Sequence, residues 1–94
     1  MIYEVLVEVR LRPGIADPQG ATIERALPAL DFTGVGTVRV GKAIRLSVEA
    51  ADEDGARDVA AAVADRLLAN PVIEDSAVTV LGVADAAARI GAAP

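Results

Sequence analysis

The sequence has 94 residues, which is enough for one domain and too few for two independent hydrophobic cores. Apolar residues make up 53% of it but only Tyr3 and Phe32 are aromatic, the nine basic residues are scattered, and the net charge is −5. This composition argues against a nucleic-acid or anionic-membrane partner, which requires clustered Lys and Arg. No apolar run approaches the roughly 18–20 residues that cross a bilayer, so we expect a cytoplasmic protein.

The first two predicted elements are a strand and a helix. Residues 2–11 alternate between apolar and polar side chains, which predicts a half-buried strand. A helix over residues 18–30 follows, because Asp17 is a good N-cap and Pro18 suits the first helical position. Pro28 removes a helical hydrogen bond and should kink the last turn.

A β-hairpin is predicted next. Two β-rich runs, residues 35–40 and 44–49, are separated by Gly41-Lys42. Glycine at the first central position suits a two-residue type II′ turn. Lys42 would then lie exposed at the tip of the hairpin.

A second helix should run from its N-cap Asp52 to about residue 69. Asn70 can take a left-handed conformation after the last turn, and Pro71 prevents continuation. A last strand covers residues 76–81. The expected buried stripe of the helix is Ala56, Val59, Ala60, Val63 and Leu67.

The resulting order β-α-β-β-α-β predicts a single-domain, ferredoxin-like α+β fold, with both helices on one face of an antiparallel sheet. We assign residues 1–82 to the domain and residues 83–94 to an alanine-rich tail. The opposite face of the sheet mixes apolar and polar side chains, so we expect another subunit to cover part of it. That face should carry Ile2, Leu6, Ala43, Arg45, Ser47, Thr79 and Leu81.

The absence of two residue types restricts the possible chemistry. The chain contains no His and no Cys, so Ser-His-Asp, Cys-His and imidazole or thiolate metal sites are impossible. Acid pairs such as Asp52 and Glu53 could bind a hard cation, but helix capping explains them better. We therefore expect no catalytic, cofactor-binding or metal-binding residue in this chain.

Three segments in this order resemble the PurS family, the small subunit of phosphoribosylformylglycinamidine (FGAM) synthase. They are Asp17-Pro18-Gln19-Gly20, Arg39-Val40-Gly41-Lys42 and Leu67-Leu68-Ala69-Asn70-Pro71-Val72-Ile73-Glu74-Asp75. The resemblance covers about residues 2–81. Ser76 departs from it, since many relatives have an aromatic residue there.

The resemblance implies a non-catalytic subunit of a purine-biosynthetic ligase. In such a complex a large synthetase subunit uses ATP and Mg to activate formylglycinamide ribonucleotide, and a glutaminase subunit releases ammonia from glutamine. The small subunit, a homodimer or higher oligomer, bridges the two and supports ammonia transfer. Two alternatives stay open: a stand-alone ferredoxin-like module that binds a small molecule, and an enzyme with a carboxylate base.

The matched segments supply the candidates for contacts with partner subunits. Some of them have structural explanations as well, since Asp17 can cap a helix and Asn70 can help to end one. The candidates are Asp17, Gln19, Gly20, Arg39, Gly41, Lys42, Asn70, Glu74 and Asp75.

Overall fold

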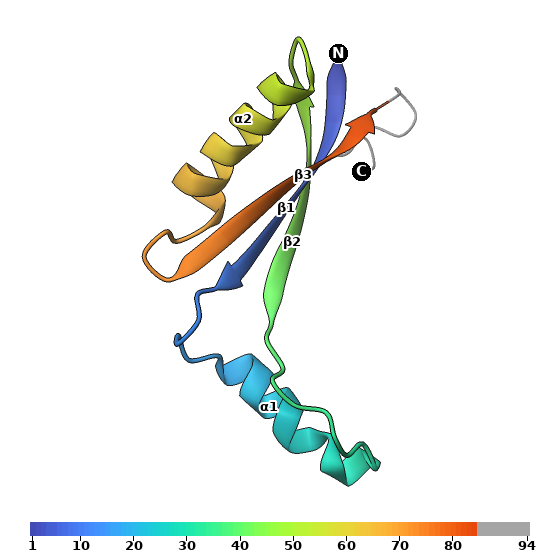
Figure 1. Ribbon diagram of the computed structural model, residues 1–94, viewed down its shortest axis with the longest axis vertical. Coiled ribbons are helices and arrows are strands. Elements are labelled where there is room, and N and C mark those ends of the chain that lie inside the picture. The colour runs from blue at the N-terminus through green and yellow to red at the C-terminus, as the bar shows by residue number, and fades with distance from the viewer. Residues whose placement is uncertain (85–94) are drawn as a thin grey trace.

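The computed structural model describes residues 1–84 and shows one three-stranded antiparallel sheet, one helix packed on it and one helical arm (Figure 1). The predicted tail lies mostly at residues 85–94, outside the described residues. In chain order the elements are β1 (Ile2–Leu11), α1 (Pro18–Ala26), the 3-10 turn η1 (Pro28–Leu30), β2 (Gly41–Glu49), α2 (Glu53–Val63), the π-type turn η2 (Ala64–Leu68) and β3 (Glu74–Val83).

The sheet has the order β2-β1-β3, with β1 in the centre. The alternation along β1 has the predicted consequence, since Val5, Val7 and Val9 are almost completely buried while Glu8 and Arg10 are exposed on the opposite face. The register places Leu6 beside Arg45 and Thr79 on this outer face. The side chains predicted for the outer face on β1 and β2 therefore share it.

Helix α2 covers the inner face through small side chains. Ala56, Ala60 and Ala64 are fully buried against the valines of β1, so helix and sheet approach closely. The predicted stripe is only partly right, because Val59 and Leu67 are 46% and 79% exposed. Their larger side chains lie on the solvent side of the alanine seam.

The predicted α+β ferredoxin-like class is confirmed, but the hairpin is wrong. Gly41 and Lys42 begin β2, which continues unbroken to Glu49, and residues 35–40 form no strand. Thr37 has a positive φ of 55°, which interrupts an extended chain. The backbone N–H groups of Val38 and Val40 donate to carboxylates of α1 instead of to a neighbouring strand.

The sequence predicts α1 on the sheet face beside α2, but the structure does not place it there. It extends beyond the end of the sheet, and residues 35–40 return along it to β2 (Figure 1). Its start at Pro18 and its interruption before Pro28 are as predicted. We call residues 12–40 the arm.

The end of α2 differs from the prediction in one detail. Asp52 is the N-cap, as expected, and accepts a hydrogen bond from Gly55 N. Asn70 does not have a positive φ, because Ala69 already leaves the helix in an extended conformation. Within residues 1–84, no helix is long and apolar enough to cross a membrane.

Candidate functional site

The candidate docking residues gather at the end of the sheet from which the arm leaves. Arg12 links their two groups: its side chain donates to Pro71 O at 2.7 Å and pairs with Asp75 at 3.4 Å. Its backbone N–H donates to Ile73 O at 2.8 Å. Four candidates lie in the arm: Asp17, Gln19, Gly20 and Arg39. Gly41 and Lys42 are the first two residues of β2. The remaining candidates, Asn70, Glu74 and Asp75, lie around the turn before β3 and at its start.

Asp17 fastens the start of α1 to the returning chain. Its carboxylate accepts hydrogen bonds from Gly20 N at 2.9 Å and from Val40 N at 2.8 Å. These two bonds are the main reason that the pKa of Asp17 lies below its ordinary value, and the nearby Arg39 guanidinium adds to the effect. The carboxylate therefore caps α1 and also joins the start of the helix to the chain that returns to β2.

Asp17→Asn should weaken the fold at neutral pH and have little effect in acid. The lowered pKa means that the ionised carboxylate stabilises the folded state above its unfolded-state pKa, and that this stabilisation disappears as pH falls through the lower folded-state value. Urea unfolding at pH 7 should show a lower midpoint for the variant. As the pH falls through the lowered folded-state pKa of Asp17, the carboxyl of the parent becomes protonated, and in acid below that value the two midpoints should converge. Asp58→Asn on the exposed surface of α2 is the control, and an equal gap at both pH values would contradict the account.

Two further side chains join the outgoing and returning parts of the arm by hydrogen bonds. The Glu24 carboxylate accepts a hydrogen bond from Val38 N. Arg39 donates to the carbonyl oxygens of Ile15 at 3.1 Å and Arg12 at 3.5 Å. The sequence pattern did not identify Glu24 or Arg12, since a single acid in a helix and a base after a strand are ordinary surface residues.

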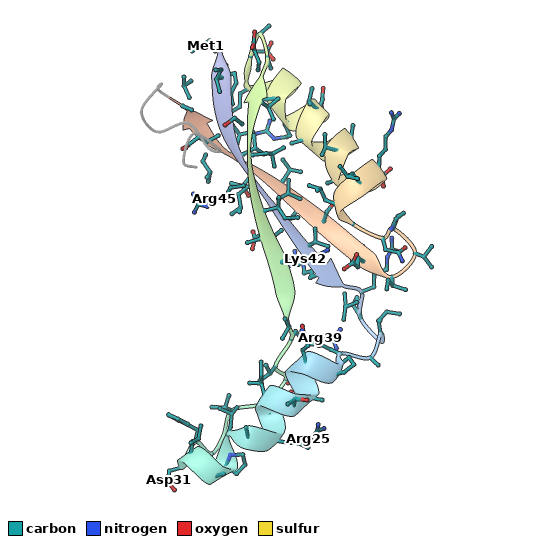
Figure 2. All side chains as sticks on the ribbon, turned by 180° about the vertical axis from the view of Figure 1, so that it is seen from behind. Met1, Arg25, Asp31, Arg39, Lys42 and Arg45 are labelled. Atoms are coloured by element: carbon teal, nitrogen blue, oxygen red, sulfur yellow. The ribbon has the colours of Figure 1, made fainter. Side chains whose placement is uncertain are left out.

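Lys42 is not at a turn tip but in the second position of β2. Its ammonium group donates to Leu68 O at 3.3 Å, at the carboxyl end of the α2–η2 helix, where a cation complements the helix dipole. Figure 2 shows Lys42 and Arg39 close to the junction of arm and sheet. Both side chains thus have structural roles in this part of the chain.

The turn after η2 is organised by two candidate side chains. The Glu74 carboxylate accepts a hydrogen bond from Asn70 N at 2.7 Å, and Asn70 Oδ1 accepts one from Val72 N at 3.1 Å. Local bonds of this kind are typical of Asn in turns. Among the candidates with polar side chains, only Gln19 is exposed and has a side chain without a hydrogen bond or ion pair to residues 1–84.

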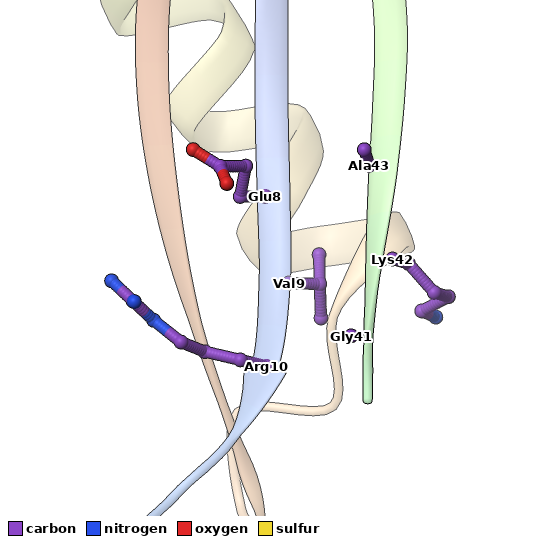
Figure 3. Close-up of a pocket in the computed structure, with 6 residues that line it drawn as sticks. All are labelled: Glu8, Val9, Arg10, Gly41, Lys42 and Ala43. Carbon is purple, nitrogen blue, oxygen red and sulfur yellow. The ribbon is translucent and has the colours of Figure 1, made fainter. Parts of the chain in front are cut away.

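A hollow of about 250 Å³ lies beside the arm junction and is lined by residues 8–10 and 41–43. Gly41 lies close to β1 at its edge, since a Cβ there would lie 2.8 Å from Val9 O. Figure 3 shows Glu8 and Arg10 projecting from β1 on the side of β3, whereas Lys42 points away on the other side. The charged groups therefore do not converge on a ligand. Within residues 1–84 no three metal-ligating side chains form a cluster.

Comparisons with known proteins agree on one family. Residues 4–82 match the family model PurS, described as phosphoribosylformylglycinamidine (FGAM) synthase. A Synechocystis protein called phosphoribosylformylglycinamidine synthase subunit PurS is 42% identical over 73 residues, which cover 78% of this chain and 73% of that protein. The Bacillus subtilis protein of the same name is 40% identical over 75 residues, or 79% and 87% of the two chains.

Solved structures show the same similarity. The crystal structure of the purS subunit from Thermotoga maritima superposes with a TM-score of 0.80 at 34% identity, covering 86% of this chain and 93% of the other. A chain in the structure of PurLQS from the same organism gives 0.79 at 34% identity, with coverage of 86% and 99%.

Proposed function

Because the chain belongs to the PurS family of FGAM synthase subunits, we propose that it is the small, non-catalytic subunit of such a synthase. The observation that carries this proposal is the family match over residues 4–82, which includes the arm, the sheet and α2. The match therefore covers the whole arrangement that holds the candidate docking residues.

The proposed reaction is the ATP- and glutamine-dependent conversion of formylglycinamide ribonucleotide to its amidine in purine biosynthesis. The large synthetase subunit activates the amide with ATP and Mg, and the glutaminase subunit supplies ammonia from glutamine. The present chain binds neither cofactor nor metal in this proposal. It bridges the two larger subunits and supports the transfer of ammonia between them.

The chemistry of the chain supports a bridging role. It has no imidazole or thiol, so it lacks the usual general base and the strongest nucleophile. Its Asp17, Glu24 and Arg39 side chains hold backbone in place. A chain in the solved structure of PurLQS from Thermotoga maritima is similar to this chain, which supports contacts with other subunits. In this proposal the chain also self-associates and works in the cytoplasm.

Gln19 offers a specific test of docking. It projects from the first turn of α1 and is exposed, so its replacement should leave the fold intact. We expect the parent chain, mixed with a synthetase and a glutaminase from one source, to co-elute with both in size-exclusion chromatography when substrates are present. Gln19→Ala should reduce co-elution while its thermal unfolding midpoint stays unchanged.

Thr22→Ala in the next turn of α1 is a suitable control, because Thr22 is also exposed and its hydroxyl bonds within the helix, donating to Pro18 O and accepting from the Arg25 guanidinium. Unchanged co-elution of Gln19→Ala would remove Gln19 from the docking surface. Failure of the parent chain to join either subunit would contradict the proposed function itself.

A further inference from the structure

The arm has little packing against its own sheet. Helix α1 packs against η1 and does not pack extensively on any strand of residues 1–84. The bonds of Asp17, Glu24 and Arg39 to Val40 N, Val38 N and Ile15 O lie inside the arm and hold it together as a unit. The direction in which this unit leaves the sheet therefore depends on the bonds at the junction (Figure 1).

Arg12, the first residue of the arm, bonds to both sides of this junction. Toward the turn before β3, its Nη2 donates to Pro71 O at 2.7 Å, and its Nε lies 3.4 Å from Asp75 Oδ1. Its backbone N–H donates to Ile73 O at 2.8 Å. Toward the arm, its carbonyl oxygen accepts a hydrogen bond from the Arg39 guanidinium at 3.5 Å. Arg12 thus connects the base of the arm to the turn before β3.

The guanidinium group suits this position because its donors lie in one rigid plane. Nη2 and Nε engage a carbonyl and a carboxylate at the same time, which fixes the orientation of the side chain as well as its distance. The ion pair with Asp75 is about half exposed at both ends, and exposed ion pairs contribute little to stability. The bonds of the Arg12 side chain therefore set a direction without adding much to the free energy of folding.

We propose that Arg12 is a positioning residue, which fixes the angle between the arm and the sheet so that both docking regions meet the larger subunits at the same time. One region is the arm with Gln19, and the other is the turn before β3 with Asn70 and Glu74. A rigid connection between two binding surfaces lowers the cost of engaging both, because the second contact forms without further ordering. This role rests on the proposed bridging function and adds to it a residue outside the docking candidates.

The absence of native cysteine allows the angle to be measured by pulsed electron spin resonance between two spin labels. Ala26→Cys at the end of α1 and Asp58→Cys on α2 replace exposed residues and carry the labels. An excess of unlabelled chain keeps two labelled copies out of the same oligomer. We expect one narrow distance distribution when Arg12 is present.

Arg12→Ala should broaden this distribution while the melting temperature changes little. Arg12→Lys should give an intermediate width, because an ammonium group keeps the charge but lacks the rigid plane of donors. If Arg12→Ala folds poorly, Arg12→Lys decides the matter, and a distribution as narrow as that of the parent chain would then overturn the role of Arg12.

The functional test is a titration of full-length chain into fixed amounts of the synthetase and the glutaminase, with glutamine-dependent amidine formation as the readout. Arg12→Ala should raise the concentration of chain that gives half-maximal activation by about fivefold or more, the lower limit of typical coupling between two binding sites. Arg12→Lys should raise this concentration less, and the maximal rate should be unchanged in both. Arg57→Ala is the matched control, since Arg57 also pairs with two acids, Glu53 and Asp54, but all three lie in α2.

Three results would overturn the positioning role: a narrow distance distribution in Arg12→Ala, the same half-maximal concentration for Arg12→Ala and Arg57→Ala, or a lower maximal rate at an unchanged half-maximal concentration. Each of them leaves the proposed function standing as long as the parent chain is required for activity. Full glutamine-dependent activity without any chain would reject the proposed function, whatever the distance measurements show for Arg12.

Discussion

Ala60→Leu should lower the free energy of unfolding by about 3 kcal/mol, the upper part of the range for overpacked cores. Ala60 is fully buried in the seam of three alanines between α2 and β1. The added isopropyl group has no space there unless the helix moves away from Val5, Val7 and Val9. In a domain of this size, such a loss corresponds to a fall of more than about 10 °C in the melting temperature, measurable by calorimetry.

Val59→Leu is the matched control for this change. Val59 is the preceding residue of the same helix and is 46% exposed, so the larger side chain extends into solvent and the melting temperature should change little. If Ala60→Leu melted like the parent chain, the alanine seam would not set the distance between helix and sheet.

Gly20→Ala should lower the free energy of unfolding by about as much as Ala60→Leu does. The cause lies in the arm. Gly20 is the buried residue of α1, and a Cβ there would overlap the carbonyl oxygen of Val38 and approach Asp17 Oδ2 to 2.9 Å. Because the overlapping atom is backbone, the returning chain must move away. The bonds from Val38 N to Glu24 and from Val40 N to Asp17 would then be strained or lost, at about 1 kcal/mol or more for each.

Gly36→Ala controls for the general effect of replacing glycine. A Cβ at Gly36 meets nothing within 4 Å, and the substitution reduces the freedom of the unfolded chain, so its stability should be equal or slightly higher. Urea unfolding of both variants measures the difference. Equal midpoints for Gly20→Ala and Gly36→Ala would show that the close approach of α1 and residue 38 is not required.

Local chemistry explains which elements could be predicted from the sequence. The bounds of β1 follow from apolar side chains at every second position, and the starts of both helices follow from Asp17-Pro18 and from Asp52, because these signals act within a few residues. The interruption of α1 before Pro28 has the same local origin. The family resemblance gave the function for a different reason, since it depended on three separated segments together.

The errors concern contacts between distant residues. Residues 35–40 have the composition of a strand, but carboxylates of α1 take the N–H groups of Val38 and Val40, and no pattern in residues 35–40 shows this. The buried stripe of α2 was misassigned for a related reason. Apolar spacing identifies the helix but does not show that β1 selects the small side chains Ala56, Ala60 and Ala64 over Val59 and Leu67.

The candidate docking residues show both what local motifs predict and what depends on contacts between distant residues. The motifs drew attention to residues that the structure places at the junction of arm and sheet. The structure then shows that the side chains of Asp17, Arg39, Lys42 and Glu74 bond to backbone within the chain, which leaves Gln19 as the clearest candidate for an external contact. A motif can mark residues that build a surface rather than residues that touch the partner.

The central claim is that this chain acts by holding two larger subunits together and not by chemistry of its own. The most direct measurement is the rate of amidine formation by the matching synthetase and glutaminase, with glutamine or with ammonium as nitrogen donor, in the presence and absence of the chain. We predict that the glutamine-dependent rate requires the chain and that the chain alone has no activity. Full glutamine-dependent activity without it, or turnover by the isolated chain, would contradict the claim.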